Sequence, residues 1–148
     1  MTNWPSRHLK LAEFISTWSK DPSTKVGAVL FREDGSIISM GYNGFPRGVK
    51  DDPKLMADRG IRLKMTLHAE VNAILAAGRN GSILSWAQLA VTRHPCSQCA
   101  AQLSQAGIKY VRYLGDPAFE ERWADDITIA RNIFKQMGVK LVRVAPEK

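Results

Sequence analysis

Hydrophobic residues along the chain alternate between helical and strand-like spacing. Residues 6–18 carry apolar side chains at helical spacing, and Ser6 is the expected N-cap. The apolar runs 26–31 and 37–42 are typical of strands. The acidic and glycine-containing turn 33–36 between them predicts an antiparallel hairpin.

The second half of the chain repeats a helix followed by a strand. The predicted helices are 68–78, 96–106 and 118–137, and the predicted strands are 89–92, 110–114 and 139–144. This order favours parallel pairing of the late strands. The core-facing stripe of the last helix is expected at Trp123, Ile127, Ala130, Phe134 and Met137. The polar residues 50–66 show no clear period, and their structure is left open.

These elements predict a three-layer α/β/α domain with a five-stranded mixed sheet and helices on both faces. The length of 148 residues suits one domain, and neither an internal repeat nor a linker divides residues 1–148.

Composition narrows the possible partners and location. Neither a signal peptide nor a membrane-spanning apolar run is evident, so a cytoplasmic protein is expected, in the host cytoplasm if the source is viral. The formal net charge of +7 favours anionic ligands such as nucleotides. The basic residues are scattered rather than gathered in one block, so binding to nucleic acid is not expected.

The candidate chemistry lies in two short motifs, each at the start of a predicted helix. Cys96 and Cys99 are the two cysteines of the chain, and their spacing is that of a metal half-site or a redox pair. One helical turn places both sulfur atoms on one side, and a helix N-terminus favours thiolate. His68 and Glu70 form the second motif.

Two thiolates and one imidazole leave a fourth position open, which is the arrangement of a catalytic zinc ion. The predicted ligands are therefore His68, Cys96 and Cys99, with one zinc ion per chain. Glu70 then acts as the proton shuttle for a water molecule whose pKa the zinc lowers. His-x-Glu followed by Pro-Cys-x-x-Cys is the signature of zinc nucleobase deaminases. His94 is a less favoured ligand, and His8 is expected to be a surface or packing residue.

Other functions remain open at this point. A redox dithiol would contain no metal, and a regulator that binds zinc or nucleotides would release no ammonia. A deaminase acting on a flipped base of a polynucleotide would share the zinc motif.

Five segments in order make the chain resemble the deoxycytidylate deaminases of the cytidine and deoxycytidylate deaminase superfamily. These segments are 19–28, 41–48, 68–74, 95–100 and 105–109. The resemblance implies the cytidine-deaminase-like form of the α/β/α fold. It also implies hydrolysis of dCMP to dUMP and ammonia, which supplies dUMP for dTMP synthesis. Another cytosine nucleotide, such as dCTP or a 5-substituted dCMP, is the alternative substrate.

The resemblance also implies a set of substrate-binding residues: Asn43, Ala69, Arg93, His94 and Pro95. Asn43 is expected to contact the sugar hydroxyl, although a turn residue would also explain it. Arg93 and His94 depart from the family pattern, and they are expected either to bind the substrate phosphate or to form a basic surface pair.

Regulation and assembly are implied in the same way. Members of this family are often hexameric, activated by dCTP and inhibited by dTTP, and Mg²⁺ would accompany the triphosphate. The effector residues that the resemblance implies are Lys20, Asp21, Gly41, Tyr42, Asn43 and Gly44. A second, structural zinc ion is not expected, because residues 50–67 contain neither cysteine nor histidine.

Overall fold

Strand β1 (Gly27–Phe31) is an inner strand, and all five of its residues are buried. Ala28 and Leu30 belong to one hydrophobic cluster, whereas Val29 and Phe31 belong to a second cluster. Successive side chains of a strand point to opposite faces, so this strand requires cover on both sides.

The computed structural model describes residues 3–147. The other strands are β2 (Ile37–Tyr42), β3 (Gln88–Val91), β4 (Tyr110–Leu114) and β5 (Lys140–Val144). They form one sheet in the order β2-β1-β3-β4-β5, in which β1 is antiparallel to both of its neighbours. Strands β3, β4 and β5 are parallel. The predicted five-stranded mixed sheet is therefore confirmed.

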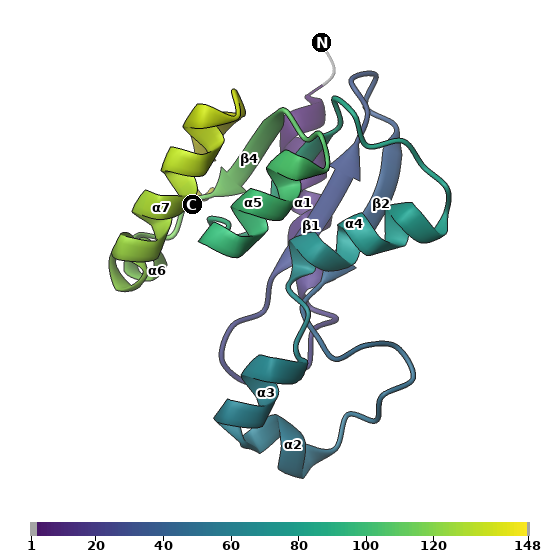
Figure 1. Cartoon of the computed structure of the whole chain (residues 1–148), viewed down its shortest axis with the longest axis vertical. Coiled ribbons are helices and arrows are strands. Elements are labelled where there is room, and N and C mark those ends of the chain that lie inside the picture. The colour runs from purple at the N-terminus through teal and green to yellow at the C-terminus, as the bar shows by residue number, and fades with distance from the viewer. Residues whose placement is uncertain (1–2, 148) are drawn as a thin grey trace.

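Helices cover both faces of this sheet (Figure 1). They are α1 (Trp4–Ser16), α2 (Pro53–Ala57), α3 (Arg59–Met65), α4 (Ala69–Arg79), α5 (Ser97–Gln105), α6 (Pro117–Arg122) and α7 (Ala124–Gln136). Helix α1 lies on one face, and α4, α5 and α7 pack on the other, which confirms the three-layer α/β/α architecture. Within residues 3–147, we find no helix with the length and apolar character needed to cross a membrane.

Small residues bring α4 unusually close to the sheet. Ala69, Ala73 and Ala77 are fully buried along one face of this helix. A Cβ atom at Gly41 of β2 would overlap the carbonyl oxygen of Ala69 and lie 2.6 Å from the backbone nitrogen of Ala73. Glycine at this position is therefore required by the close approach of the two backbones, which fixes the start of α4 over the sheet.

The predicted limits of the first helix were wrong at both ends. The helix begins at Trp4, and the side chain of Asn3, not of Ser6, accepts the capping hydrogen bond. It ends at Ser16, where the hydroxyl groups of Ser16 and Thr17 donate to backbone carbonyls one turn earlier. Such hydroxyls compete with the helical hydrogen-bond pattern. Trp18 therefore lies outside the helix, 48% exposed.

The unassigned segment 50–66 contains the short helices α2 and α3, which extend beyond the end of the sheet (Figure 1). Asp52 and Asp58 cap them through their side chains. Buried Arg62 of α3 donates to the carbonyl of Met56 at 2.7 Å. Its guanidinium also lies 3.9 Å from the carboxylate of Asp21, which fastens the two helices to the loop before β1.

The predicted helix 118–137 is interrupted at Trp123, and α6 and α7 are separate helices. Asp116 caps α6, and Trp123 adopts a non-helical conformation (φ −107°, ψ 21°) between the two helices. Ile127, Ala130 and Phe134 of the predicted stripe are buried. The two ends of the stripe were predicted wrongly, because Trp123 is 44% exposed and Met137 is 39% exposed.

Candidate active site and metal centre

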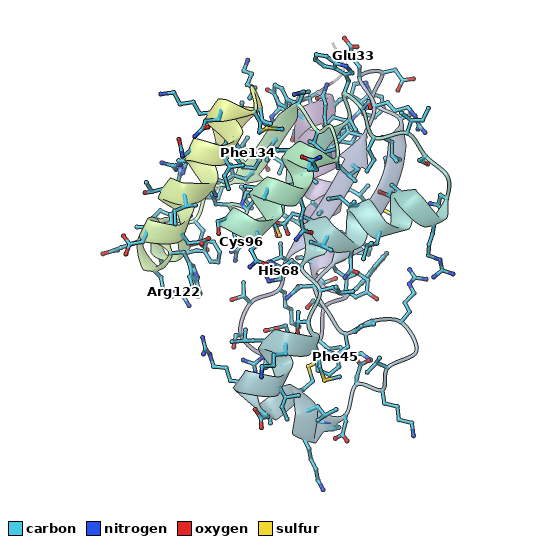
Figure 2. The ribbon with its side chains drawn as sticks, in the orientation of Figure 1. Glu33, Phe45, His68, Cys96, Arg122 and Phe134 are labelled. Atoms are coloured by element: carbon cyan, nitrogen blue, oxygen red, sulfur yellow. The ribbon has the colours of Figure 1, made fainter. Side chains whose placement is uncertain are left out.

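Two helices begin close together at one end of the sheet. His68 is the N-cap of α4, and Cys96 is the N-cap of α5, both with extended backbone conformations. Cys99 follows in the first turn of α5. Figure 2 shows His68 and Cys96 next to each other between these two helix starts. The tertiary structure thus joins two motifs that lie far apart in the sequence.

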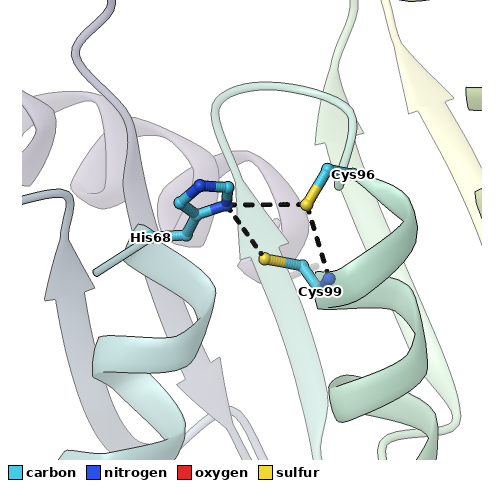
Figure 3. A group of neighbouring side chains, drawn as sticks. All are labelled: His68, Cys96 and Cys99. Carbon is cyan, nitrogen blue, oxygen red and sulfur yellow. Dashed lines mark hydrogen bonds between the residues drawn. The ribbon is translucent and has the colours of Figure 1, made fainter. Parts of the chain in front are cut away.

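The three side chains form the group of residues 3–147 whose donor atoms could hold a metal ion (Figure 3). The Nδ1 atom of His68 lies 3.5 Å from the sulfur of Cys96 and 3.3 Å from the sulfur of Cys99, and all three donor atoms lie within 4.8 Å. Tetrahedral zinc with bonds of about 2.1–2.3 Å separates its ligand atoms by about 3.5–3.8 Å. The donor set and its spacing therefore fit zinc.

The three residues differ in their accessibility to solvent. Cys99 is buried, Cys96 is half-buried and His68 is exposed. One side of the group consequently faces the solvent-accessible cavity described below. An open side is what distinguishes a catalytic zinc site from a structural site with four protein ligands.

Hydrogen bonds within the group shift the pKa values of the two cysteine thiols in opposite directions. The thiol of Cys99 and the ring of His68 lower the pKa of Cys96 to about 4, and the backbone N–H of Cys99 also donates to its sulfur, at 3.4 Å. The same sulfur–sulfur contact and burial raise the pKa of Cys99. The hydrogen bond with Cys96 raises the pKa of His68 to about 8. Cys96 is therefore the stronger thiolate of the pair.

Glu70 lies in the first turn of α4 and is 5% exposed. Burial raises the pKa of its carboxyl group to about 7. Glu70 is outside the group of metal-ligating side chains found in the described chain, but it lines the same cavity as His68 and Cys96. Its carboxyl group is thus available for proton exchange with a molecule in that cavity.

This cavity has a volume of about 550 Å³, which suits a small-molecule ligand. Its walls come from the starts of α4 and α5, from α3, and from α6 with the first turn of α7. Polar groups on several walls can therefore contact one bound molecule.

Asn43 lines the cavity and is 7% exposed. Its side-chain oxygen accepts a hydrogen bond from the backbone N–H of Val26 at 2.8 Å, and its amide nitrogen donates to the carbonyl of Thr24 at 2.8 Å. Asn43 thus fixes the loop before β1, and one N–H and one oxygen lone pair remain for a ligand.

The other predicted substrate residues have different surroundings. Ala69 and His94 line the cavity, whereas Pro95 is fully buried behind it. The Nδ1–H of His94 donates to the carbonyl of Pro95 at 2.8 Å, so its Nε2 atom accepts from Arg131 at 3.4 Å. Burial lowers the pKa of His94, which keeps it neutral. Arg93 also lines the cavity, half-buried.

The predicted effector residues lie in two neighbouring segments, 20–21 and 41–44, which are joined by the hydrogen bond that the Ser19 hydroxyl donates to the carbonyl of Asn43 at 2.8 Å. Of the six, only Asp21 and Asn43 line the cavity of Glu70. Gly41 is buried beneath α4, as described above, while Tyr42 is 39% exposed. The remaining two make other contacts: Lys20 pairs with Asp51 at 2.7 Å, and Gly44 pairs its backbone with Leu67.

Sequence reasoning missed four charged residues of the cavity wall: Arg59, Arg62, Arg122 and Asp126. Arg59 belongs to α3, in the segment without a clear period, and Arg122 and Asp126 flank the unpredicted break at Trp123. No motif distinguishes these residues from other charged surface residues. The acidic caps at Asp52 and Asp58 could have indicated the helices of the missed segment.

Comparison with known proteins places this site in a family. The model of the cytidine and deoxycytidylate deaminase zinc-binding region matches residues 2–114, which include Glu70 and the three ligating side chains. The chain belongs to the cytidine and deoxycytidylate deaminase family. Members of this family are zinc-dependent deaminases, so the chain is a deaminase, as its sequence indicated.

Relatives within the family cover nearly the whole chain. The uncharacterised deaminase of the luxG 3′ region of Aliivibrio fischeri is 41% identical over 143 residues, which are 95% of this chain and 93% of that protein. Mouse deoxycytidylate deaminase is 33% identical in an alignment of 149 positions that covers 97% of this chain and 81% of that protein. The dCMP deaminase of cyanophage S-TIM5, solved with dCMP and dUMP, has a TM-score of 0.80 and 27% identity, covering 97% of this chain and 99% of that chain.

The three donor atoms predict the zinc content of the purified protein. The wild-type protein is expected to contain one zinc ion per chain, and Cys99→Ala should lose it, because two remaining ligands hold zinc weakly. His94→Gln serves as the control and should retain zinc, since His94 is bonded to Pro95 and Arg131 instead. Elemental analysis measures both. Less than half an equivalent in the wild-type protein after expression with ample zinc would contradict this assignment.

Proposed function

We propose that this chain hydrolyses dCMP to dUMP and ammonia. The observation that carries the proposal is that the group of His68, Cys96 and Cys99 borders, through His68 and Cys96, the same cavity as buried Glu70. Support for the substrate comes from the mouse deoxycytidylate deaminase and from the cyanophage enzyme that was solved with dCMP and dUMP. Such an activity would supply dUMP for dTMP synthesis.

In this proposal, His68, Cys96 and Cys99 hold one catalytic zinc ion per chain. When bound, zinc lowers the pKa of a water molecule to roughly 7 and so makes hydroxide available at neutral pH. The residues of the chain supply everything else that the reaction needs: a place for the base, a route for protons and a site for the phosphate.

Glu70 is the proposed proton shuttle. Its buried carboxylate accepts a proton from the attacking water and donates it to the N3 atom of the cytosine ring, which makes C4 electrophilic. The water oxygen forms a bond to C4. The second proton of the water then passes through Glu70 to the amino group, the C4–N bond breaks, and ammonia leaves. One water molecule is consumed for each dUMP and each ammonia formed.

Four arginines line the cavity, but two of them are already engaged. Arg62 is buried against Met56 and Asp21, and Arg93 lies 3.4 Å from the carboxylate of Asp116. The side chains of Arg59 on α3 and Arg122 on α6 make no ion pair or hydrogen bond within residues 3–147. We therefore assign the substrate phosphate to these two, because guanidinium groups bind phosphate through charge-assisted hydrogen bonds.

The residues that the sequence predicted to bind the substrate have more limited roles in this proposal. Asn43 offers its free amide N–H to the sugar hydroxyl, from a loop that it fixes itself. Ala69 contributes its backbone at the start of α4, next to Glu70. Arg93 and neutral His94 shape the wall near Cys96, with Pro95 held behind them by His94.

Regulation and assembly complete the proposal. Activation by dCTP with Mg²⁺, inhibition by dTTP and a hexameric assembly are taken from the family resemblance. A single domain over residues 1–148 and a cytoplasmic location are taken from the length and composition of the sequence. Because Asp21 and Asn43 line the catalytic cavity, an effector that contacts them would compete with the substrate. An effector bound outside the cavity would have to use Lys20, Tyr42 and Gly44 instead.

The substrate proposal predicts the outcome of an assay of ammonia release. Among dCMP, dCTP, CMP, deoxycytidine, 5-methyl-dCMP and a cytosine-containing oligonucleotide, dCMP should have the highest kcat/KM. Each substrate is assayed with and without dCTP and dTTP. A clear preference for dCTP would contradict the monophosphate assignment, and activity on the oligonucleotide alone would indicate a polynucleotide deaminase.

The proposed role of Glu70 predicts a loss of turnover without a loss of metal. Glu70→Gln preserves the shape of the side chain but cannot carry the proton, so kcat should fall by about 10²- to 10⁴-fold or more. Zinc content should stay at the wild-type level, because Glu70 is outside the ligand group. Turnover near the wild-type value would show that the proton travels by another route.

The proposed phosphate site predicts a change in substrate affinity. Arg59→Ala and Arg122→Ala should each raise KM for dCMP about tenfold or more and leave kcat nearly unchanged, because the phosphate contact is lost equally in ground and transition states. KM for deoxycytidine, which has no phosphate, should change little. Arg79→Ala, at the other end of α4, is the matched control. Equal effects on both substrates would refute the assignment.

A further inference from the structure

Asp126 connects α7 to the turn of α5 that carries the cysteines. One of its carboxylate oxygens accepts a hydrogen bond from the backbone N–H of Ser97 at 2.9 Å, and the other accepts from the hydroxyl of Ser97 at 2.7 Å. Ser97 is the first residue of α5 and directly follows Cys96. Both oxygens of the carboxylate are thus engaged by one residue next to a zinc-ligating side chain.

These two hydrogen bonds stabilise the start of α5, where the helix provides no hydrogen-bond partners of its own. The first backbone N–H groups of a helix have no partner within the helix. In α5, the sulfur of Cys96 accepts from the N–H of Cys99, and Asp126 accepts from the N–H of Ser97. The carboxylate of Asp126 is hydrogen-bonded to both the backbone and the side chain of Ser97, and this limits rotation of the first turn of α5. The orientation of that turn sets the direction of the Cys96 sulfur.

Asp126 is itself held firmly. It lies in the first turn of α7, where the positive end of the helix dipole favours a carboxylate. The next residue, Ile127, is buried, as are Ala130 and Phe134 further along the same helix. The helix break at Trp123 allows α7 to begin at this point. The acceptor therefore comes from a packed helix rather than from a mobile loop.

We propose that Asp126 is a positioning residue for the metal centre, acting through Ser97 on Cys96. This proposal rests on the proposed zinc ligands and extends them to a residue outside the ligand group. Partners that orient metal ligands from behind typically contribute about 10- to 100-fold to metal affinity. A carboxylate that only joined two helices would stabilise the metal-free protein and leave the zinc affinity of the folded protein unchanged.

The test measures the zinc dissociation constant by competition with a chromophoric chelator, at protein concentrations and temperatures where circular dichroism shows the metal-free variants to be folded. Asp126→Ala should weaken zinc binding about 10- to 100-fold. Ser97→Ala keeps the hydrogen bond from the backbone N–H, and Asp126→Asn keeps a neutral amide oxygen as its acceptor but loses the charge. Each should therefore weaken zinc binding by a smaller factor, about 2- to 10-fold. Asp125→Ala removes an exposed neighbouring carboxylate and should bind zinc as the wild-type protein does.

The proposal would be overturned if Asp126→Ala and Asp125→Ala bound zinc with equal affinity. It would also be overturned if Asp126→Ala lowered the melting temperature of the metal-free protein without changing its zinc affinity. If Asp126→Ala does not fold, the two milder variants decide in the same way. The readout does not involve dCMP, so a protein that binds zinc but deaminates another nucleotide leaves this test intact. A wild-type protein that binds no zinc would refute the ligand assignment and this proposal together.

Discussion

The active site depends on one geometric constraint, which is that two helices must begin at nearly the same point in space. His68 and Cys96 are the N-caps of α4 and α5, and their donor atoms lie 3.5 Å apart. A shift of about 1.5 Å, the rise of one helical residue, would separate them beyond the reach of one zinc ion. The architecture of the sheet and its helices serves to hold that distance.

The sheet sets the distance through packing rather than through bonds between the ligands. Gly41 and the buried alanines of α4 allow the helix backbone to touch β2, which leaves little freedom to slide. Helix α5 packs against the same face between α4 and α7, with Leu103 fully buried, and Asp126 holds its first residue. In a close-packed interior, a small displacement of one residue moves its neighbours. Residues that do not contact the zinc site therefore affect the positions of its ligands.

In the proposed function, the residues for the chemical step and those for substrate selection lie in different parts of the molecule. The zinc-ligating residues and Glu70 lie on the two helix starts, where packing is tight. The cavity-lining arginines whose side chains have no partner within residues 3–147, to which the proposal assigns the phosphate, lie on the shorter helices α3 and α6. Such a division lets one reactive centre serve different nucleobase substrates when the surrounding short helices change.

The sequence by itself determined the chemistry and the layering. The spacing of Cys96 and Cys99, with His68 and Glu70, indicated an open zinc site, and hydrophobic periodicity gave the strands and their pairing, because both are local patterns. Only the tertiary structure decided which ordinary charged residues line the cavity. Arg122 and Asp126 carry no motif, and their roles follow from the break at Trp123, where capping and packing override an unbroken helical pattern. Which residues contact each other across the fold depends on how distant segments of the chain pack. The local spacing of residues in the sequence does not specify this packing.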